Sequence, residues 1–108
     1  MTVNDLISRT GFSAIALPSP EREVEGAYIG DLLSWVMGRA ESGNAWITIM
    51  SNVNVIAVAT LADVSCVILA EGVTPDEDVL DVALKKDVNV LSSPLPMYDV
   101  AITLKDLI

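Results

Sequence analysis

The chain has 108 residues, of which 52% are hydrophobic and 19% are charged, and its formal net charge is −9. This length and composition predict a single domain over residues 1–108 with a hydrophobic core of its own. The strong negative charge argues against nucleic acid and anionic membrane surfaces as partners, because both are polyanions.

The N-terminus and the cysteine usage bear on the compartment. Met1–Asp5 lacks the basic residues and the apolar run of a signal peptide, and no stretch reaches the roughly 20 apolar residues of a membrane-spanning helix. Cys66 is the only cysteine, so no intramolecular disulfide can form. We therefore expect a soluble protein of the cytoplasm.

The N-terminal third predicts two helices and a short strand around an unusual polar segment. Thr2 can cap a helix that Gly11 stops, and Asp31 stands where the N-cap of the second helix would lie. Pro18 and Pro20 end the strand. The expected elements are a helix over Thr2–Thr10, a strand over Phe12–Leu17, a polar segment over Glu21–Asp31 containing a further candidate strand over Glu23–Tyr28, and a helix over Leu32–Ala40.

The central third predicts a strand, a helix and a second strand. Ala45–Met50 is rich in β-branched and aromatic residues, and Cys66–Ala70 is a continuous apolar run of strand length. Asn54–Asp63 lies between them and favours a short crossover helix. Strands that are apolar on both faces usually lie inside a parallel sheet covered by helices.

The last third predicts a helix, a strand and a final helix. Thr74 as N-cap and Pro75 at the first helical position predict a helix that runs to about Asp87. A third parallel strand is expected over Val88–Leu91, and a last helix from about Pro96 to the end. The fold class is therefore α/β, a small layered domain with a mostly parallel central sheet flanked by helices.

In a parallel sheet, ligands bind beyond the carboxyl ends of the strands. Loops that precede helix N-termini there predict a pocket for a small anionic or nucleotide ligand. The alternative is that these residues are ordinary caps and turns, and no lysine or arginine lies in the loops to bind phosphate. The candidate ligand-binding residues are Gly30, Asp31, Asn52, Asn54, Gly72, Thr74, Ser92 and Ser93.

The sequence contains no motif that predicts an active site. The chain has no histidine and no Gly-x-x-x-x-Gly-Lys-Ser/Thr loop, and Cys66 sits in a predicted core strand without a basic neighbour. We predict no catalytic residue, no metal ligand and no cofactor. The alternative is a small metal-dependent hydrolase that uses Glu25, Asp31 and Asn54, motivated only by polar residues near glycines.

The last helix is apolar over much of its circumference, which is typical of a helix that contacts two neighbours. In so small a chain the second neighbour is expected to be another subunit, so we predict a homodimer. The candidate interface residues are Trp35, Tyr98, Leu104 and Ile108.

Five segments, in the same order along nearly the whole chain, resemble the small stand-alone proteins of the DRTGG-domain family. They are Arg22–Ser34, Trp46–Ile49, Asn52–Ala59, Val67–Leu69 and Pro75–Glu77. Related domains occur beside cystathionine-β-synthase-type domains in a family of pyrophosphatases, and the N-terminal domain of HPr kinase/phosphorylase is also similar. The resemblance implies a small α/β regulatory or dimerisation domain and not a catalyst.

The chain departs from the pattern that names this family. Ser51–Asn54 stands where an Asp-Arg pair is expected, and Ala70-Glu71-Gly72 keeps only the last glycine of Thr-Gly-Gly. The preferred hypothesis is thus a non-catalytic regulatory module that dimerises and binds a small ligand at the loop crevice. The alternatives are the metal-dependent hydrolase and an adaptor subunit of a signalling or redox complex.

Overall fold

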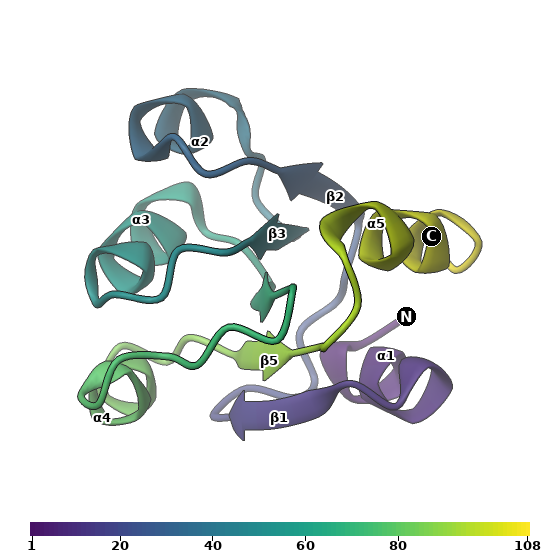
Figure 1. The fold of residues 1–108 in the computed structure, drawn as a ribbon, viewed down its shortest axis with the longest axis horizontal. Helices are drawn as coiled ribbons and strands as arrows, with labels where there is room; N and C mark the ends of the chain where they lie inside the picture. Colours follow the sequence, from purple (N-terminus) through teal and green to yellow (C-terminus); the bar gives the residue numbers. More distant parts are fainter.

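A computed structural model describes residues 1–108 and shows a five-stranded sheet with helices on both faces (Figure 1). The helices are α1 (Val3–Thr10), α2 (Leu33–Arg39), α3 (Asn54–Ala62), α4 (Val79–Lys85) and α5 (Met97–Lys105). The strands are β1 (Ser13–Ala16), β2 (Gly26–Ile29), β3 (Asn44–Thr48), β4 (Cys66–Leu69) and β5 (Val90–Ser92). The α/β class predicted from the sequence is confirmed.

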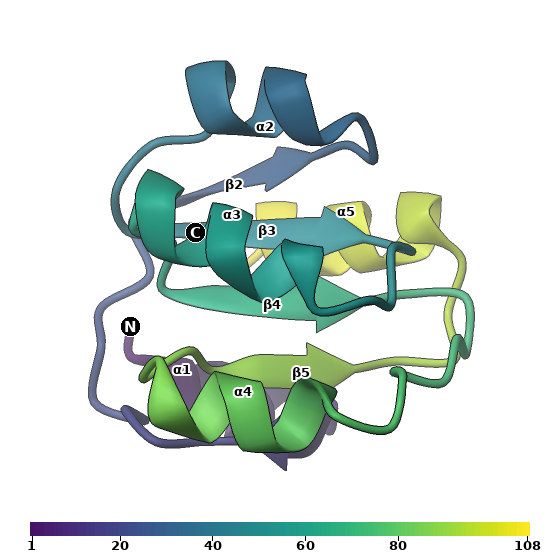
Figure 2. The same cartoon turned by 90° about the vertical axis from the view of Figure 1, so that its left-hand side faces the viewer.

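The sheet has the order β1-β5-β4-β3-β2. Strands β2, β3, β4 and β5 are parallel (Figure 2). Strand β1 pairs antiparallel with β5 at one edge. The predicted three-strand parallel core is therefore extended by β2, whose place the sequence left open. Each parallel step crosses over through a helix, as parallel connections require.

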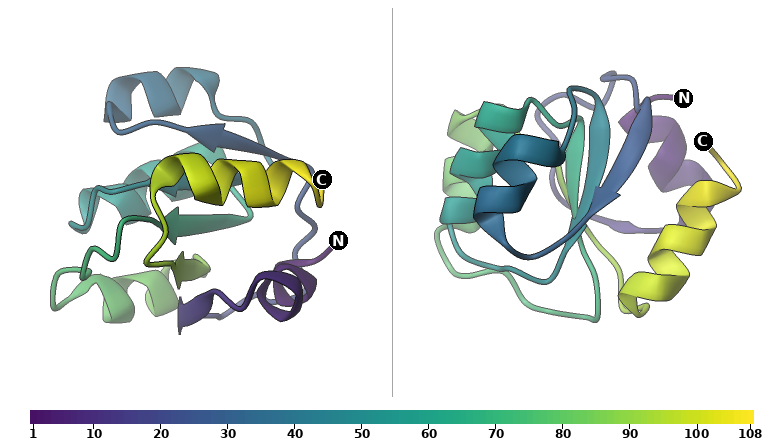
Figure 3. Two further views of the ribbon diagram at one scale, coloured as in Figure 1. Left: turned by 45° about the vertical axis from the view of Figure 1, so that its right-hand side comes forward. Right: turned by 90° about the horizontal axis from the view of Figure 1, so that it is seen from above.

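Two hydrophobic cores lie on the two faces of the sheet. Helices α2, α3 and α4 cover one face, whereas α1 and α5 cover the other, where both chain termini also lie (Figures 1 and 3). Side chains alternate along β3, so that Trp46 packs toward the first set of helices and Ile47 toward the second. All five residues of β3 are buried, as expected for a strand whose two faces are both covered by helices.

The first helix is capped as its sequence predicts. The Thr2 hydroxyl accepts a hydrogen bond from the Asp5 amide at 3.1 Å, and the Asp5 carboxylate accepts one from the Thr2 amide at 2.9 Å. Gly11 then ends the helix with φ 74°, a left-handed conformation that glycine adopts without a steric penalty.

No helix in the structure is both long and apolar enough to cross a membrane.

The start of α4 corrects a prediction. Thr74 and Pro75 do not open the helix, which begins at Val79 after Asp78 in the N-cap position. The Asp76 amide instead donates to the Ser51 carbonyl at 2.9 Å. This contact holds the segment before α4 against the loop after β3, so a tertiary interaction overrides the local helix-start signal.

Candidate functional site

The four parallel strands end at the same side of the sheet, which we call the C-terminal edge. Its loops span residues 30–32, 49–53, 70–78 and 93–96, between the strands and the helices that follow them. All eight candidate ligand-binding residues lie in these loops or directly beside them. The fold therefore brings these eight residues to one edge of the sheet.

Asp31 connects two neighbouring loops and does not cap α2. Its carboxylate oxygen Oδ1 accepts hydrogen bonds from the Thr48 hydroxyl at 2.6 Å and the Ile49 amide at 3.0 Å. Leu32 occupies the N-cap position of α2 without a side-chain hydrogen bond. The expectation of an Asp31 cap is wrong, because the end of β3 competes for the same carboxylate.

Gly30 joins the same pair of strands through its backbone. Its amide donates to the Ile47 carbonyl at 3.1 Å, and its carbonyl accepts from the Trp46 indole N–H at 2.9 Å. Trp46 is fully buried, so this bond satisfies the one polar atom of its side chain. Gly30 thus has a structural role in the turn after β2.

Asn52 and Asn54 form a closed turn before α3. The Asn52 side-chain oxygen accepts from the Asn54 amide at 2.9 Å, and the Asn52 carbonyl accepts from the Val55 amide at 3.1 Å. The Ile56 amide donates to the Val53 carbonyl at 3.0 Å. The first amides of α3 are therefore already used within the chain.

The loops after β4 and β5 are bonded to each other. Gly72, at φ 69°, donates its amide to the Ser93 carbonyl at 3.0 Å, while the buried Ser93 hydroxyl accepts from the Leu95 amide at 3.1 Å. Ser92 belongs to β5 and pairs with Leu69. Thr74 is exposed in the loop before α4.

Glu71 is a residue of this edge that the sequence analysis did not single out. One of its carboxylate oxygens accepts from the Met97 amide at 2.9 Å, which places a negative charge at the N-terminus of α5. The two residues are 26 positions apart, so no local sequence signal identifies the contact.

The largest cavity does not lie between these loops but between α3 and α4. This α3–α4 groove has a volume of about 520 Å³. Its apolar lining is Val53, Ile56, Ala57, Leu61 and Val82, and its polar lining is Asn54, Thr60, Asp78 and Lys86. Asn54 alone among the candidate ligand-binding residues lines it.

The residues of the hydrolase alternative do not converge. Glu25 precedes β2 and Asp31 follows it, so the two carboxylates lie at opposite ends of an extended segment, about 20 Å apart along its length. No group of three or more cysteine, aspartate or glutamate side chains could hold a metal ion.

Cys66 is buried in β4, and desolvation raises the pKa of its thiol to about 12.

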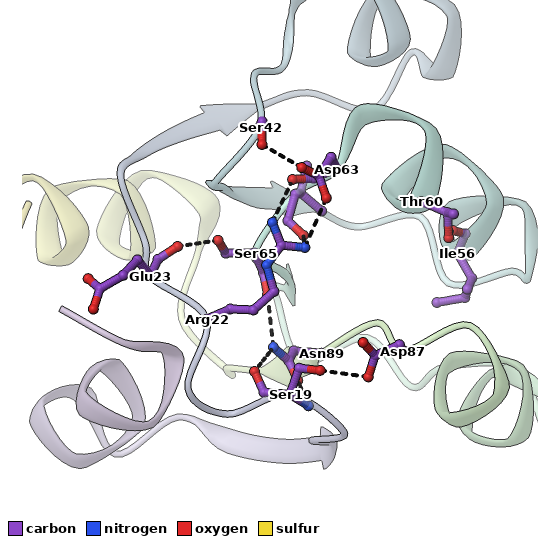
Figure 4. Close-up of polar contacts among 11 residues, drawn as sticks. Ser19, Arg22, Glu23, Ser42, Ile56, Thr60, Asp63, Ser65, Asp87 and Asn89 are labelled. Atoms are coloured by element: carbon purple, nitrogen blue, oxygen red, sulfur yellow. Dashed lines mark hydrogen bonds and ion pairs between the residues drawn. The ribbon is translucent and has the colours of Figure 1, made fainter.

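A second polar cluster lies at the opposite, N-terminal edge of the sheet, and its centre is the buried side chain of Asn89 (Figure 4). The amide nitrogen donates to the Ser19 carbonyl at 2.7 Å and to the Ser65 carbonyl at 2.9 Å, while the amide oxygen accepts from the Ser19 amide at 2.9 Å. The Ser19 hydroxyl donates to Asp87 at 2.6 Å. Asn89 thus fastens the chain after β1 to the starts of β4 and β5.

Arg22 extends this cluster toward α3 (Figure 4). Its guanidinium donates to the carbonyls of Asp63 and Val64, both at 3.1 Å, and forms an ion pair with the Asp63 carboxylate at 3.1 Å. The Ser42 hydroxyl donates to the same carboxylate at 2.5 Å. The hydrogen bond from Ser42, followed by the charge of Arg22, holds the pKa of Asp63 below its ordinary value.

The candidate interface residues divide into exposed and buried. Tyr98 is 74% exposed, Trp35 is 53% exposed and Ile108 is 40% exposed, and the Trp35 ring lies 3.8 Å from the Arg39 guanidinium. Leu104 is only 1% exposed and packs in the core beneath α5. Its assignment to an interface is wrong, because the face of α5 that carries it covers the sheet of its own chain.

Comparisons with known proteins agree with this fold. The DRTGG domain family matches residues 19–107. No curated protein is significantly similar to the chain in sequence. A solved structure of the regulatory region of Clostridium perfringens pyrophosphatase, comprising CBS and DRTGG domains in complex with the activator diadenosine tetraphosphate, superposes with a TM-score of 0.73 at 14% sequence identity. The match covers 95% of this chain and 45% of that one.

The family match and the structural match concern the same region. The matched residues include β2 to β5 with all the helices between them and α5. At 14% identity, the structural similarity establishes the fold and nothing about ligands. Because the family match spans most of the sequence and the architecture agrees with it, this chain belongs to the DRTGG-domain family.

Proposed function

We propose that this protein is a non-catalytic regulatory module that acts as a homodimer. One observation carries the proposal. The polar groups at the C-terminal edge are bonded to one another, as in the Asp31–Thr48 and Glu71–Met97 contacts, whereas large apolar side chains such as Leu61 and Tyr98 are exposed on the helices. A surface of this kind suits contact with protein more than the binding and turnover of a substrate.

The similarity to a regulatory region supports the same class of function. In the C. perfringens pyrophosphatase a DRTGG domain occurs together with CBS domains in one regulatory region. This chain spans about half of that region. By analogy, we propose that it transmits a signal to a partner through its own association.

A small anionic or nucleotide ligand at the C-terminal edge is the second candidate function. It is supported by α3, which begins at this edge with no acidic residue in its first turn. It is opposed by the charge of the loops, where Asp31, Glu71 and Asp76 lie without a lysine or arginine. The amides at the start of α3 are also already paired, so we rank this candidate below self-association.

Native mass spectrometry combined with sedimentation velocity tests both candidates. We expect a dimer at micromolar concentration in about 150 mM salt, because screening reduces the mutual repulsion of two chains of charge −9. A chain that remains monomeric at 100 µM (an order-of-magnitude ceiling for a working dimer) would contradict the proposal. Diadenosine tetraphosphate and ATP serve as ligand probes, and a retained nucleotide mass would favour the second candidate.

The hydrolase alternative is tested in the same preparation. We expect Mg²⁺, Mn²⁺ and Zn²⁺ to leave the melting temperature unchanged, because a metal that binds the folded state must raise it. A reproducible rise with one of these ions would require a site that the carboxylate positions do not indicate.

A further inference from the structure

We propose that the α3–α4 groove is the surface on which a second copy of this chain docks, with Leu61 of each copy inserted into the groove of the other. This inference rests on the proposed homodimer and names the face that forms it. The groove and an exposed apolar side chain lie on the same face, so the face is complementary to itself. A twofold interface requires this property, because both copies contribute the same patch.

Helix α3 offers an uncharged surface beside the groove. Its nine residues, Asn54–Ala62, contain no charged side chain in a protein of net charge −9. Ala57 and Leu61 are four residues apart on one face and both are exposed, Leu61 by 73%. Below them the groove has an apolar floor that includes Ile56. Two such faces can approach without the repulsion that opposes contact elsewhere on the surface.

The α4 side of the groove carries one charge of each sign, so two copies can pair their charges across a twofold interface. Asp78 stands at the N-cap position of α4 and Lys86 at its C-cap, and both line the groove. They are eight positions apart, so they lie about 12 Å from each other along the helix. If the twofold axis lies in the interface plane and perpendicular to α4, the two α4 helices run antiparallel. Asp78 then faces the partner's Lys86, and the interface carries two opposite-charge pairs at its rim.

Other exposed apolar residues have neighbours that suit a dimer interface less well. Tyr98, at 74% exposure, lies on α5 beside Asp99. Trp35 already has a partner in the Arg39 guanidinium of its own helix. Neither position borders a cavity, whereas Leu61 borders the largest one. The helical face around α3 is therefore the surface that the observations favour.

The apolar contact is tested with Leu61→Asp against Leu84→Asp. Leu84 is 49% exposed on α4 but does not line the groove, so the control adds the same charge to a similar helix surface. Sedimentation equilibrium should show that Leu61→Asp raises the dimer dissociation constant by about 100-fold or more, because a central side chain is lost twice in a symmetric interface. Leu84→Asp should stay close to the wild type, and circular dichroism verifies that both variants fold.

The charge contact is tested by exchanging the two ends of α4. Asp78→Lys and Lys86→Asp should each weaken dimerisation by roughly tenfold, since two attractive rim contacts become repulsive. The double variant should recover the wild-type affinity. Asp81→Lys carries the same charge change on the same helix outside the groove and controls for net charge. Asp78 makes no capping hydrogen bond, so its replacement does not remove a cap.

The outcomes separate this inference from the proposed function. A wild-type protein that stays monomeric overturns both. A wild-type dimer that tolerates Leu61→Asp as well as Leu84→Asp keeps the homodimer and overturns the α3–α4 groove as its interface. Recovery of affinity in the exchanged double variant, with loss in both single variants, supports the antiparallel arrangement.

Discussion

The two edges of the parallel sheet both carry polar clusters, and they differ in burial. At the N-terminal edge, Asn89 is 1% exposed and makes three hydrogen bonds to segments far apart in sequence. At the C-terminal edge, Asp31 and Asn52 make similar bonds in partly exposed turns. Parallel topology singles out the C-terminal edge for ligands, yet here its side chains fasten loops. The position of a loop in a fold therefore suggests a ligand-binding site, but a ligand also needs side chains that are not already hydrogen-bonded within the chain.

The largest expected effect is at the buried edge. Asn89→Ala removes three hydrogen bonds and leaves the Ser19 amide without its acceptor and the Ser65 carbonyl without its donor. We expect unfolding free energy to fall by about 3 kcal/mol. The melting temperature should then drop by roughly 10–20 °C. Asn52→Ala is the matched control at the C-terminal edge, where one exposed bond is lost. Equal losses in urea denaturation would show that burial does not distinguish the two edges.

An intermediate effect is expected at Asp31. Asp31→Ala leaves the Thr48 hydroxyl and the Ile49 amide without their acceptor, at a cost of about 2 kcal/mol. Asp31→Asn keeps an oxygen acceptor without the charge and should lose about half as much. Hydrogen exchange of the Ile49 amide should accelerate in the alanine variant. Unchanged exchange and stability would mean that Asp31 is free for another role, which would revive it as a ligand-binding residue.

The smallest effect is a pH dependence at Asp63. Because its folded pKa is lowered, Asp63 stabilises the fold above the ordinary aspartate pKa, about 4, and this contribution disappears as pH falls through the folded value. Asp63→Asn should therefore melt slightly below the wild type at pH 7, and the difference in melting temperature should shrink as pH falls through the folded pKa of Asp63. Asparagine tolerates the left-handed φ of 57° at this position, so the backbone is preserved.

Asp106→Asn controls for the loss of one negative charge in that comparison. Differential scanning calorimetry between pH 2 and pH 7 measures the difference between the two melting curves. A difference that persists at the lowest pH would assign the effect to packing and not to the ionised carboxylate with its Ser42 and Arg22 partners.

Much of the architecture could be predicted from local pattern. The apolar runs at Ala45–Met50 and Cys66–Ala70 became β3 and β4, and the intervening segment became α3 almost within its expected bounds. These predictions succeeded because a strand that is buried on both faces leaves a continuous apolar signature. The resemblance to the DRTGG family, which rested on Arg22–Ser34 and four other segments, is confirmed by the family match.

The candidate site was less accessible to such reasoning. The sequence located the loops of the C-terminal edge, but it could not assign Asp31 to Thr48, 17 positions away, or Glu71 to Met97, 26 positions away. Thr74 and Pro75 carry a strong helix-start signal, and the contact of Asp76 with Ser51 moved the start to Val79. The groove beside α3 was not foreseen, since it depends on how α4 packs.

The sequence by itself determined the class of fold, because the period and composition of each segment report which of its faces must leave water. Only the tertiary structure decided which polar groups are already paired and which apolar side chains stay exposed. Asn89 and Ser19 are 70 positions apart and meet only when β1 pairs with β5. Hydrogen bonds and grooves between distant segments depend on distances in three dimensions, and local sequence patterns do not reveal these distances.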